Sequence, residues 1–261
     1  MGTGTTDAGS VTIAWERTGS GAPVVLVHGI TESHGTWAPI VDRLATDREV
    51  VTVDLRGHGD SSAGPSYELG DLAADVHAVI ADLGLDRPDV VGHSLGGAVV
   101  SGLGAFGGVR SVVNVDQSLA LSAFQDQVRS VEPMLRDAAA FPMVIAGLFD
   151  QLAGPLSSAE RERVGALRRP DQHVVLGVWR VLLEADAADV DAAIDAALAG
   201  YAANPVPYLS IMGVDPGSEY AGWIEARIPG AVTEVWADHG HYPHLVDPDR
   251  FVNRLHEFWS A

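Results

Sequence analysis

A serine lies between two glycines in the segment Gly92-His93-Ser94-Leu95-Gly96. A short apolar run precedes the segment and a second one follows it, as expected where a buried strand turns into a helix. The turn is so tight that a side chain two residues before or after the serine would clash, which explains the glycines. The serine hydroxyl would be exposed beside the amides at a helix start, which can stabilise negative charge. The pattern therefore predicts a nucleophile at Ser94.

The elements that must hold this turn are buried strands alternating with helices. Helical patterns cover residues 36–46 and 68–84. Short apolar runs typical of strands that are covered on both faces occupy residues 23–29, 49–59, 88–94, 111–118 and 207–215. This alternation predicts an α/β fold with a mostly parallel central sheet flanked by helices, with the ligand site at the carboxyl ends of the strands. Before these runs, residues 10–19 alternate between apolar and polar, which predicts an edge strand ending in a hairpin turn.

Residues 117–205 interrupt the alternation of strand and helix. Several helical patterns occur there, but no convincing buried strand does, and the sheet pattern resumes at residue 206. We therefore expect a core domain made of residues 1–116 and 206–261. Residues 117–205 would form a helical cap, or lid, inserted after the strand that ends at Asp116.

Four segments of the chain resemble the α/β-hydrolase family, in that family's order. They are VLVHGI at residues 25–30, DLRGHGDS at 54–61, GHSLGG at 92–97 and GHYPHLVDP at 240–248. The resemblance covers nearly all of the chain outside the insertion and implies the α/β-hydrolase fold. It also implies that Ser94 is the nucleophile, that His241 is its general base, and that the backbone amides of Ile30 and Leu95 form the oxyanion hole.

A serine hydrolase also needs an acid that orients its histidine, and two aspartates compete for this role. In most members of the family the acid follows the strand two units after the serine turn, where this chain has Asp215. The spacing departs from the usual pattern, because Asp215 lies two residues after Gly213 rather than three. A minority of relatives take the acid from the end of the strand that follows the helix after the serine, where Asp116 stands. We take Asp215 as the first candidate, Asp116 as its rival and Glu219 as a distant third.

The predicted cap supplies candidates for an apolar substrate pocket. Phe141, Met143 and Trp179 could line it, although each could instead pack the cap onto the sheet. His28 also stands near the pocket, where it could contact substrate or serve as a structural hydrogen-bonding residue.

The composition limits both the chemistry and the partners. Sixteen Lys and Arg stand against 35 Asp and Glu, a formal net charge of −19, which repels the phosphates of nucleic acids and anionic lipids. We expect neither nucleic acid nor a membrane as a partner. The absence of cysteine excludes disulfides, thiolate metal sites and a cysteine nucleophile. Residues 1–10 show no basic region followed by an apolar one, and we expect a cytoplasmic protein.

The histidines near the C-terminus raise the question of a metal. His239, His241 and His244 are closely spaced, but no carboxylate pair at a suitable spacing accompanies them. We therefore predict no metal and no cofactor.

The expected activity is cofactor-independent hydrolysis of a carboxylic ester or lactone through an acyl-enzyme on Ser94, an esterase or lactonase type of reaction. The substrate would be a small molecule with an apolar portion. Relatives with the same residues also cleave carbon–carbon bonds in β-diketone-like compounds or make peracids. A C–C bond hydrolase or a perhydrolase, similar to the cofactor-free haloperoxidases, is therefore an alternative. A non-catalytic small-molecule receptor on the same fold is a second alternative. However, the turn at residues 92–96 (the serine turn) and the segment at residues 240–248 that carries His241 (the histidine loop) favour an enzyme.

Overall fold

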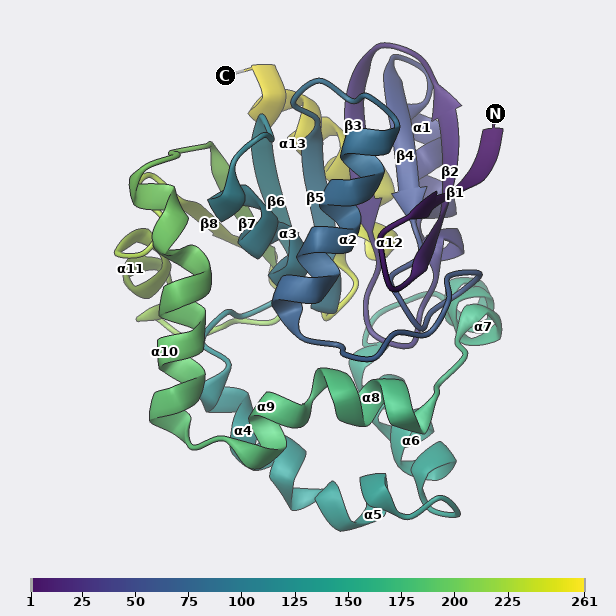
Figure 1. The fold of residues 1–261 in the computed structure, drawn as a ribbon, viewed down its shortest axis with the longest axis vertical. Helices are drawn as coiled ribbons and strands as arrows, with labels where there is room; N and C mark the ends of the chain where they lie inside the picture. Colours follow the sequence, from purple (N-terminus) through teal and green to yellow (C-terminus); the bar gives the residue numbers. More distant parts are fainter. Residues whose placement is uncertain (1, 261) are drawn as a thin grey trace.

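The computed structural model describes residues 2–260 and contains one eight-stranded sheet in the order β1-β2-β4-β3-β5-β6-β7-β8 (Figure 1). The strands are β1 Gly2–Asp7, β2 Thr12–Gly19, β3 Ala22–Val27, β4 Arg48–Val53, β5 Asp89–His93, β6 Ser111–Val115, β7 Tyr208–Met212 and β8 Val232–Val235. Strands β3 to β8 run parallel to one another, and β2 is antiparallel to both β1 and β4. The predicted mostly parallel sheet is confirmed.

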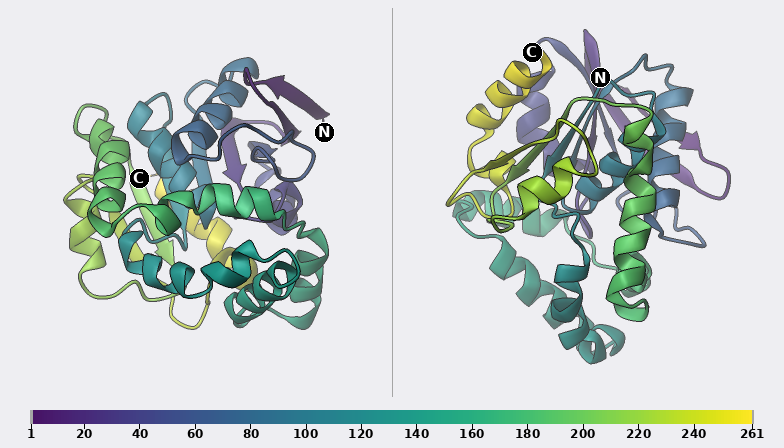
Figure 2. Two further views of the ribbon diagram at one scale, coloured as in Figure 1. Left: turned by 60° about the horizontal axis from the view of Figure 1, so that its bottom comes forward. Right: turned by 90° about the vertical axis from the view of Figure 1, so that its left-hand side faces the viewer.

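Helices cover both faces of the sheet, which explains why its central strands are buried along their whole length. Every residue of β5, β6 and β7 is buried. Helices α2 and α3 pack on one face, and α1 and α13 pack on the other, so that two apolar clusters sandwich the sheet (Figure 2). Outside residues 117–205 the helices are η1 His34–Trp37, α1 Ala38–Leu44, α2 Leu69–Asp82, α3 Leu95–Phe106, α11 Tyr220–Glu225, α12 Pro243–Val246 and α13 Pro248–Ser260.

Between β6 and β7 the described chain forms helices only. They are α4 Ser122–Ser130, α5 Glu132–Arg136, α6 Phe141–Leu152, α7 Ser158–Leu167, α8 Gln172–Val178, α9 Arg180–Glu184, α10 Ala187–Leu198 and η2 Ala199–Ala202. Helices α4 to α9 lie beyond the carboxyl ends of the parallel strands (Figure 1). We call residues 117–205 the insertion. Among residues 2–260, no helix combines the length and the apolar character that crossing a bilayer would require.

The N-terminal part of the sheet differs from the prediction. Strand β2 does not form a hairpin with β3, because β4 lies between them in the sheet. Its hairpin partner is β1, through a turn in which the Ala8 amide donates to the Val11 carbonyl across 2.9 Å. Two strands have no counterpart among the predicted elements: β1, whose residues are small and polar, and β8, an edge strand whose residues are exposed or half-buried.

Candidate active site

Ser94 lies at the junction of β5 and α3, with a φ of 51° and a ψ of −122°. A positive φ is unusual for a residue with a side chain and persists only where the surroundings impose it. A Cβ on Gly92 would lie 2.0 Å from the carbonyl oxygen of Gly96, and a Cβ on Gly96 would lie 2.2 Å from that of Val27. The predicted steric reason for both glycines is therefore confirmed.

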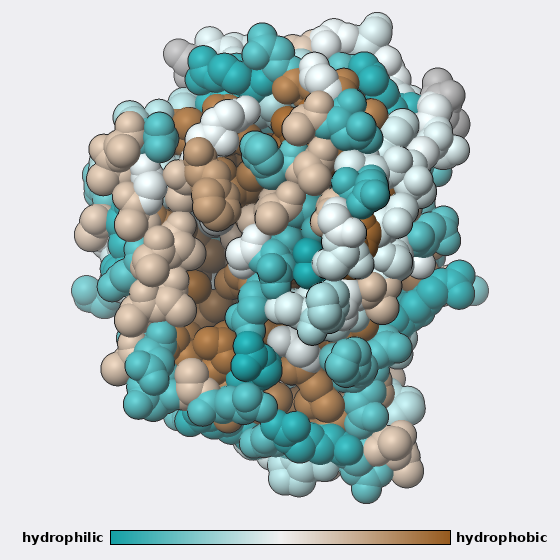
Figure 3. Space-filling model, viewed as in Figure 1, coloured by the Kyte–Doolittle hydropathy of each residue, from teal (hydrophilic) through white to brown (hydrophobic). Residues whose placement is uncertain are grey.

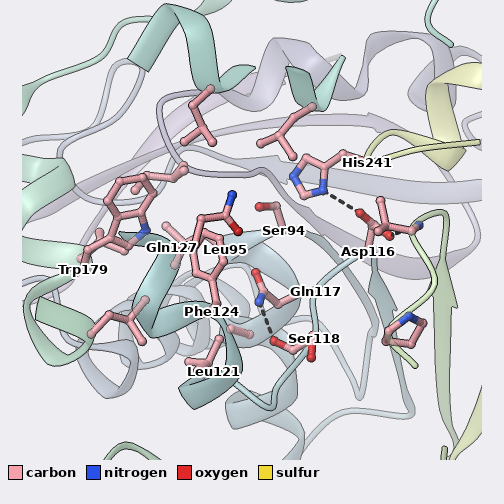
Figure 4. Close-up of a pocket in the computed structure, with 18 of the residues that line it drawn as sticks. Ser94, Leu95, Asp116, Gln117, Ser118, Leu121, Phe124, Gln127, Trp179 and His241 are labelled. Atoms are coloured by element: carbon pink, nitrogen blue, oxygen red, sulfur yellow. Dashed lines mark hydrogen bonds and ion pairs between the residues drawn. The ribbon is translucent and has the colours of Figure 1, made fainter. Parts of the chain in front are cut away.

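Ser94 opens into a pocket of about 330 Å³ between the sheet edge and the insertion (Figure 4). Most of the pocket wall is apolar, and a hollow with apolar surface is visible between the core and the insertion (Figure 3). The apolar residues that the insertion contributes are Leu121, Phe124, Leu148, Phe149, Leu152, Val178, Trp179, Val181 and Leu182. The polar groups of the wall, apart from Ser94 and His241, are Asp116, Gln117, Ser118, Gln127 and Asp215.

His241, in the loop before α12, pairs with Asp116, which directly follows β6. Its Nδ1 donates to Asp116 Oδ2 across 2.6 Å, and Figure 4 shows the ring between Ser94 and Asp116. The other oxygen, Asp116 Oδ1, accepts from the amides of Gly213 at 2.7 Å and Val214 at 2.9 Å. These bonds hold the carboxylate, and its bond to Nδ1 leaves Nε2 of His241 free of the proton, as a general base requires.

Burial lowers the pKa of His241 below its ordinary value, although the hydrogen bond and the negative charge of Asp116 act in the opposite direction. The side chain is only 11% exposed. The imidazole is therefore neutral at neutral pH and able to accept a proton.

The structure reverses the expected order of the two rival acids. Asp215 is exposed, and its Oδ1 accepts from the Gly217 amide rather than from His241. The amides at the end of β7, in Gly213 and Val214, bind Asp116 instead, so this loop supports an acid that comes from the neighbouring strand. Asp215 remains at the pocket wall without contacting the imidazole.

The backbone amides of Ile30 and Leu95, the predicted oxyanion hole, belong to residues of the pocket wall. Neither amide has an acceptor among the hydrogen bonds of residues 2–260. A Cβ on Gly29 would lie 3.2 Å from the Cβ of Ser94, so the loop that carries Ile30 packs directly against the serine. The two amides are available to a charge that forms next to Ser94.

Of the four predicted pocket residues, only Trp179 lines the pocket. The prediction for Phe141 and Met143 was wrong. Phe141 is buried in the core, and Met143 is 72% exposed on the outer side of α6. Helix α6 is apolar on most sides, so its sequence pattern does not indicate which face meets the pocket. The wall is formed by Leu148, Phe149 and Leu152 of that helix, which the sequence analysis did not single out.

His28 does not line the pocket either, and its contacts are those of a structural hydrogen-bonding residue, the other role considered for it from the sequence. It is fully buried, its Nδ1 lies 2.7 Å from the Gly29 carbonyl oxygen, and its Nε2 accepts from the Leu55 amide at 3.1 Å. This pattern assigns the proton to Nδ1. Burial lowers the pKa of His28, so the ring is neutral and fixes the loop that carries Ile30.

The three histidines near the C-terminus do not converge on one point. His244 is buried against Trp37, with ring centroids 4.6 Å apart, and His239 Nδ1 lies 2.9 Å from the Ala237 carbonyl oxygen. Among residues 2–260, no group of three or more His, Asp or Glu side chains is placed to hold a metal ion.

Residues 24–254 match the model described as the alpha/beta hydrolase family. The chain belongs to this family. The match spans the serine turn, the histidine loop and the insertion of this alpha/beta hydrolase.

Relatives of this hydrolase differ in what they are named for. The 2-(acetamidomethylene)succinate hydrolase of Mesorhizobium japonicum is 31% identical over 154 residues, which are 56% of this chain and 55% of that relative. The N-formylmaleamate deformylase of Pseudomonas putida is 38% identical over 102 residues, 38% of each chain. The chain thus spans about half the length of the first of these relatives and 38% of the length of the second.

Among solved structures, an esterase from Exiguobacterium antarcticum superposes with a TM-score of 0.83 over 100% of both chains, at 21% identity. At this identity the likeness shows the fold alone. The α/β-hydrolase fold expected from the sequence is confirmed.

Proposed function

We propose that this alpha/beta hydrolase is a serine hydrolase that cleaves carboxylic esters or lactones through an acyl-enzyme on Ser94. One observation carries the proposal: a serine with a positive φ stands in one pocket with a paired His241–Asp116 and with the amides of Ile30 and Leu95, which have no acceptor among residues 2–260. These are the groups that acyl transfer requires, namely a nucleophile, a base with its orienting acid, and donors for an oxyanion.

In the first half of the reaction, His241 Nε2 takes the proton of Ser94 while Oγ attacks the carbonyl carbon of the substrate. The charge that develops on the carbonyl oxygen is bound by the amides of Ile30 and Leu95. One such donor is worth roughly 3 kcal/mol in other serine hydrolases. Asp116 balances the positive charge of the imidazolium. The carbon–oxygen bond to the leaving group then breaks, and His241 gives its proton to the departing alcohol.

In the second half, a water molecule replaces the alcohol beside His241. The imidazole takes a proton from the water as it attacks the acyl carbon, and the same two amides bind the second oxyanion. The bond to Ser94 then breaks, His241 returns the proton to Oγ, and the carboxylic acid leaves. In a lactone, the alcohol and the acid stay joined in one open product.

The pocket favours a small substrate with an uncharged, apolar portion. Leu148, Phe149 and Trp179 form part of a mostly apolar wall, and neither Lys nor Arg lines the described pocket. Asp215 and a net charge of −19 add negative potential. We propose that the insertion covers this portion of the substrate as a cap, and that the protein acts in the cytoplasm on a free small molecule.

Cleavage of another bond by the same residues is a second candidate function. The relatives named for 2-(acetamidomethylene)succinate and N-formylmaleamate support it, because these names are not those of simple esters. However, a substrate with carboxylates needs cationic partners, which the wall of this pocket lacks. Ester or lactone hydrolysis is therefore the function that the pocket supports better.

A fluorophosphonate probe tests the nucleophile directly, because it reacts with an activated serine. We expect rapid labelling of the protein and none of the Ser94→Ala variant. A panel of p-nitrophenyl esters, lactones and aryl β-diketones then separates the two candidate reactions. A well-folded protein that never labels and turns over no member of the panel would leave only the receptor alternative.

A further inference from the structure

Behind the pocket, Glu32 is a buried carboxylate that the catalytic steps above do not use. Its side chain is 1% exposed and does not line the pocket. Oε2 accepts from the Gly29 amide at 3.2 Å, and Oε1 accepts from the Tyr242 hydroxyl at 2.8 Å. Glu32 thereby joins the loop that carries the Ile30 amide to the residue next to His241.

His93 extends this contact to the serine turn. Its Nε2 donates to the His241 carbonyl oxygen at 2.8 Å, while its Nδ1 faces Glu32 Oε2 at 3.4 Å. The ring is buried, with its centroid 4.7 Å from that of His241. The residue just before Ser94 therefore holds the backbone of the general base.

Arg168, at the end of α7, connects the insertion to the same group of residues. Its Nη2 donates to the Tyr242 hydroxyl at 2.6 Å, and its guanidinium lies 4.1 Å from the ring centroid of Phe149, a residue of the pocket wall. The next residue, Arg169, donates its amide to the Thr31 carbonyl at 3.0 Å, and Thr31 has a φ of 65°. The insertion thus contacts the Ile30 loop through the Arg169 backbone and the His241 loop through the Arg168 side chain.

The charges in this group depend on one another. Burial would raise the pKa of Glu32, but His93, the Tyr242 hydroxyl and the Arg168 charge lower it below its ordinary value. Glu32 is therefore an ionised carboxylate in the interior, a state that requires hydrogen bonds and opposite charge close by. Removal of one partner should move the others, because a buried charge without partners is costly.

We propose that Glu32, His93, Tyr242 and Arg168 are positioning residues that couple the docking of the insertion to the placement of the Ile30 amide and His241. The inference rests on the proposed function, since it assigns these residues to the alignment of that reaction. None of the four lines the pocket, so they act through the groups that do. A misplacement of about 1 Å in reacting groups can cost about 100-fold in rate, so a small relaxation of this group should reduce turnover.

Arg163 provides a matched control. It also lies in α7 and is partly buried, and it also ties the insertion to the core, through Nη1 to the Gly35 carbonyl at 2.9 Å and Nη2 to the Thr36 carbonyl at 3.0 Å. It has no hydrogen bond to Glu32 or Tyr242. A loss of docking alone should affect Arg163→Met and Arg168→Met equally.

The experiment compares Arg168→Met with Arg163→Met for kcat and KM on a p-nitrophenyl ester, for the rate of fluorophosphonate labelling, and for the melting temperature. We expect Arg168→Met to lower both kcat and the labelling rate tenfold or more while KM stays within about twofold. Arg163→Met should leave kcat and labelling near wild type even where its melting temperature falls as far. Arg168→Lys, which retains a donor for Tyr242, should recover part of the loss.

Tyr242→Phe, which removes only the hydroxyl, keeps the test decisive if Arg168→Met fails to fold, and it should reproduce the selective loss of kcat. Equal effects of the two arginine variants, or an effect on KM alone, would overturn the coupling while wild-type labelling at Ser94 leaves the proposed function standing. A wild-type protein that neither labels nor turns over the ester would overturn both.

Discussion

His241 Nδ1 and Asp116 Oδ2 lie 2.6 Å apart, although 125 residues separate them in the sequence. The carboxylate is also fixed by two amides from the end of a third segment, at Gly213 and Val214. An aspartate held in this way cannot turn away from the imidazole without losing both amide bonds. This relationship supports the assignment of Asp116, and not Asp215, as the acid of the proposed triad.

Replacement of Asp116 by Asn should lower kcat by several orders of magnitude, because an amide at this position favours the wrong tautomer of His241. The corresponding change in a serine protease costs about 10⁴-fold. Asp215→Asn should change kcat by less than about threefold, since Asp215 does not contact His241. Steady-state hydrolysis of a p-nitrophenyl ester by both variants measures the difference. The opposite ranking would return the role to Asp215.

The pH dependence of kcat/KM should reflect the lowered pKa of His241. Only the neutral imidazole accepts the serine proton, and burial holds its pKa below the ordinary value of about 6.5 despite Asp116. At pH 6.5 activity should therefore exceed half of its maximum, and it should decline further as the pH drops and the ring becomes protonated. A pH series with a substrate that does not itself titrate gives the midpoint. A midpoint above 6.5 would contradict the dominance of burial.

The pocket should discriminate against a charged acyl chain. We expect p-nitrophenyl hexanoate to be hydrolysed at least about tenfold faster, in kcat/KM, than the mono-p-nitrophenyl ester of adipic acid, because no cation in the pocket wall compensates the second carboxylate.

Gln127, an exposed residue at the pocket wall, offers a test of the cause of this preference. Gln127→Arg should narrow the gap between the two esters by raising kcat/KM for the adipate ester. Gln127→Met, of similar length without charge, should leave the gap unchanged. Equal rates for the two esters with the wild-type protein would show that charge does not select the substrate.

Alanine substitution at two glycines of α3 should change the free energy of unfolding in opposite directions. A Cβ at Gly96 would lie 2.2 Å from the Val27 carbonyl oxygen, whereas a Cβ at Gly102 meets nothing within 4 Å. Gly96→Ala should destabilise by about 1–3 kcal/mol or more through this clash. Gly102→Ala should stabilise by up to about 1 kcal/mol, because alanine favours a helix. Urea unfolding of both variants measures the change, and a neutral Gly96→Ala would contradict the steric account of the turn.

Much of the core fold could be predicted because the burial of its central strands is reflected in their own amino-acid composition. Strands β5, β6 and β7 are each built on a short run rich in β-branched and other apolar residues because helices cover both faces, and such runs are recognisable without knowledge of neighbours. Strand β1 consists of small and polar residues that are mostly exposed, and the four-residue β8 is exposed or half-buried, so neither edge strand gives a comparable signal. The partner of β2 could not be deduced either, because pairing depends on the order of strands in the sheet.

The residues of the site likewise fall into those whose arrangement local sequence determines and those whose arrangement depends on tertiary packing. The sequence by itself determined the serine turn, because its geometry depends on sterics among Gly92, Ser94, Gly96 and their nearest backbone neighbours. Only the tertiary structure decided which acid meets His241 and which apolar side chains of α6 and α9 form the pocket. Two aspartates follow the ends of adjacent parallel strands, and their sequence contexts are equally suitable. The choice between them depends on where a loop that begins more than a hundred residues after Asp116 meets the sheet edge, and long-range packing rather than any local pattern sets that position.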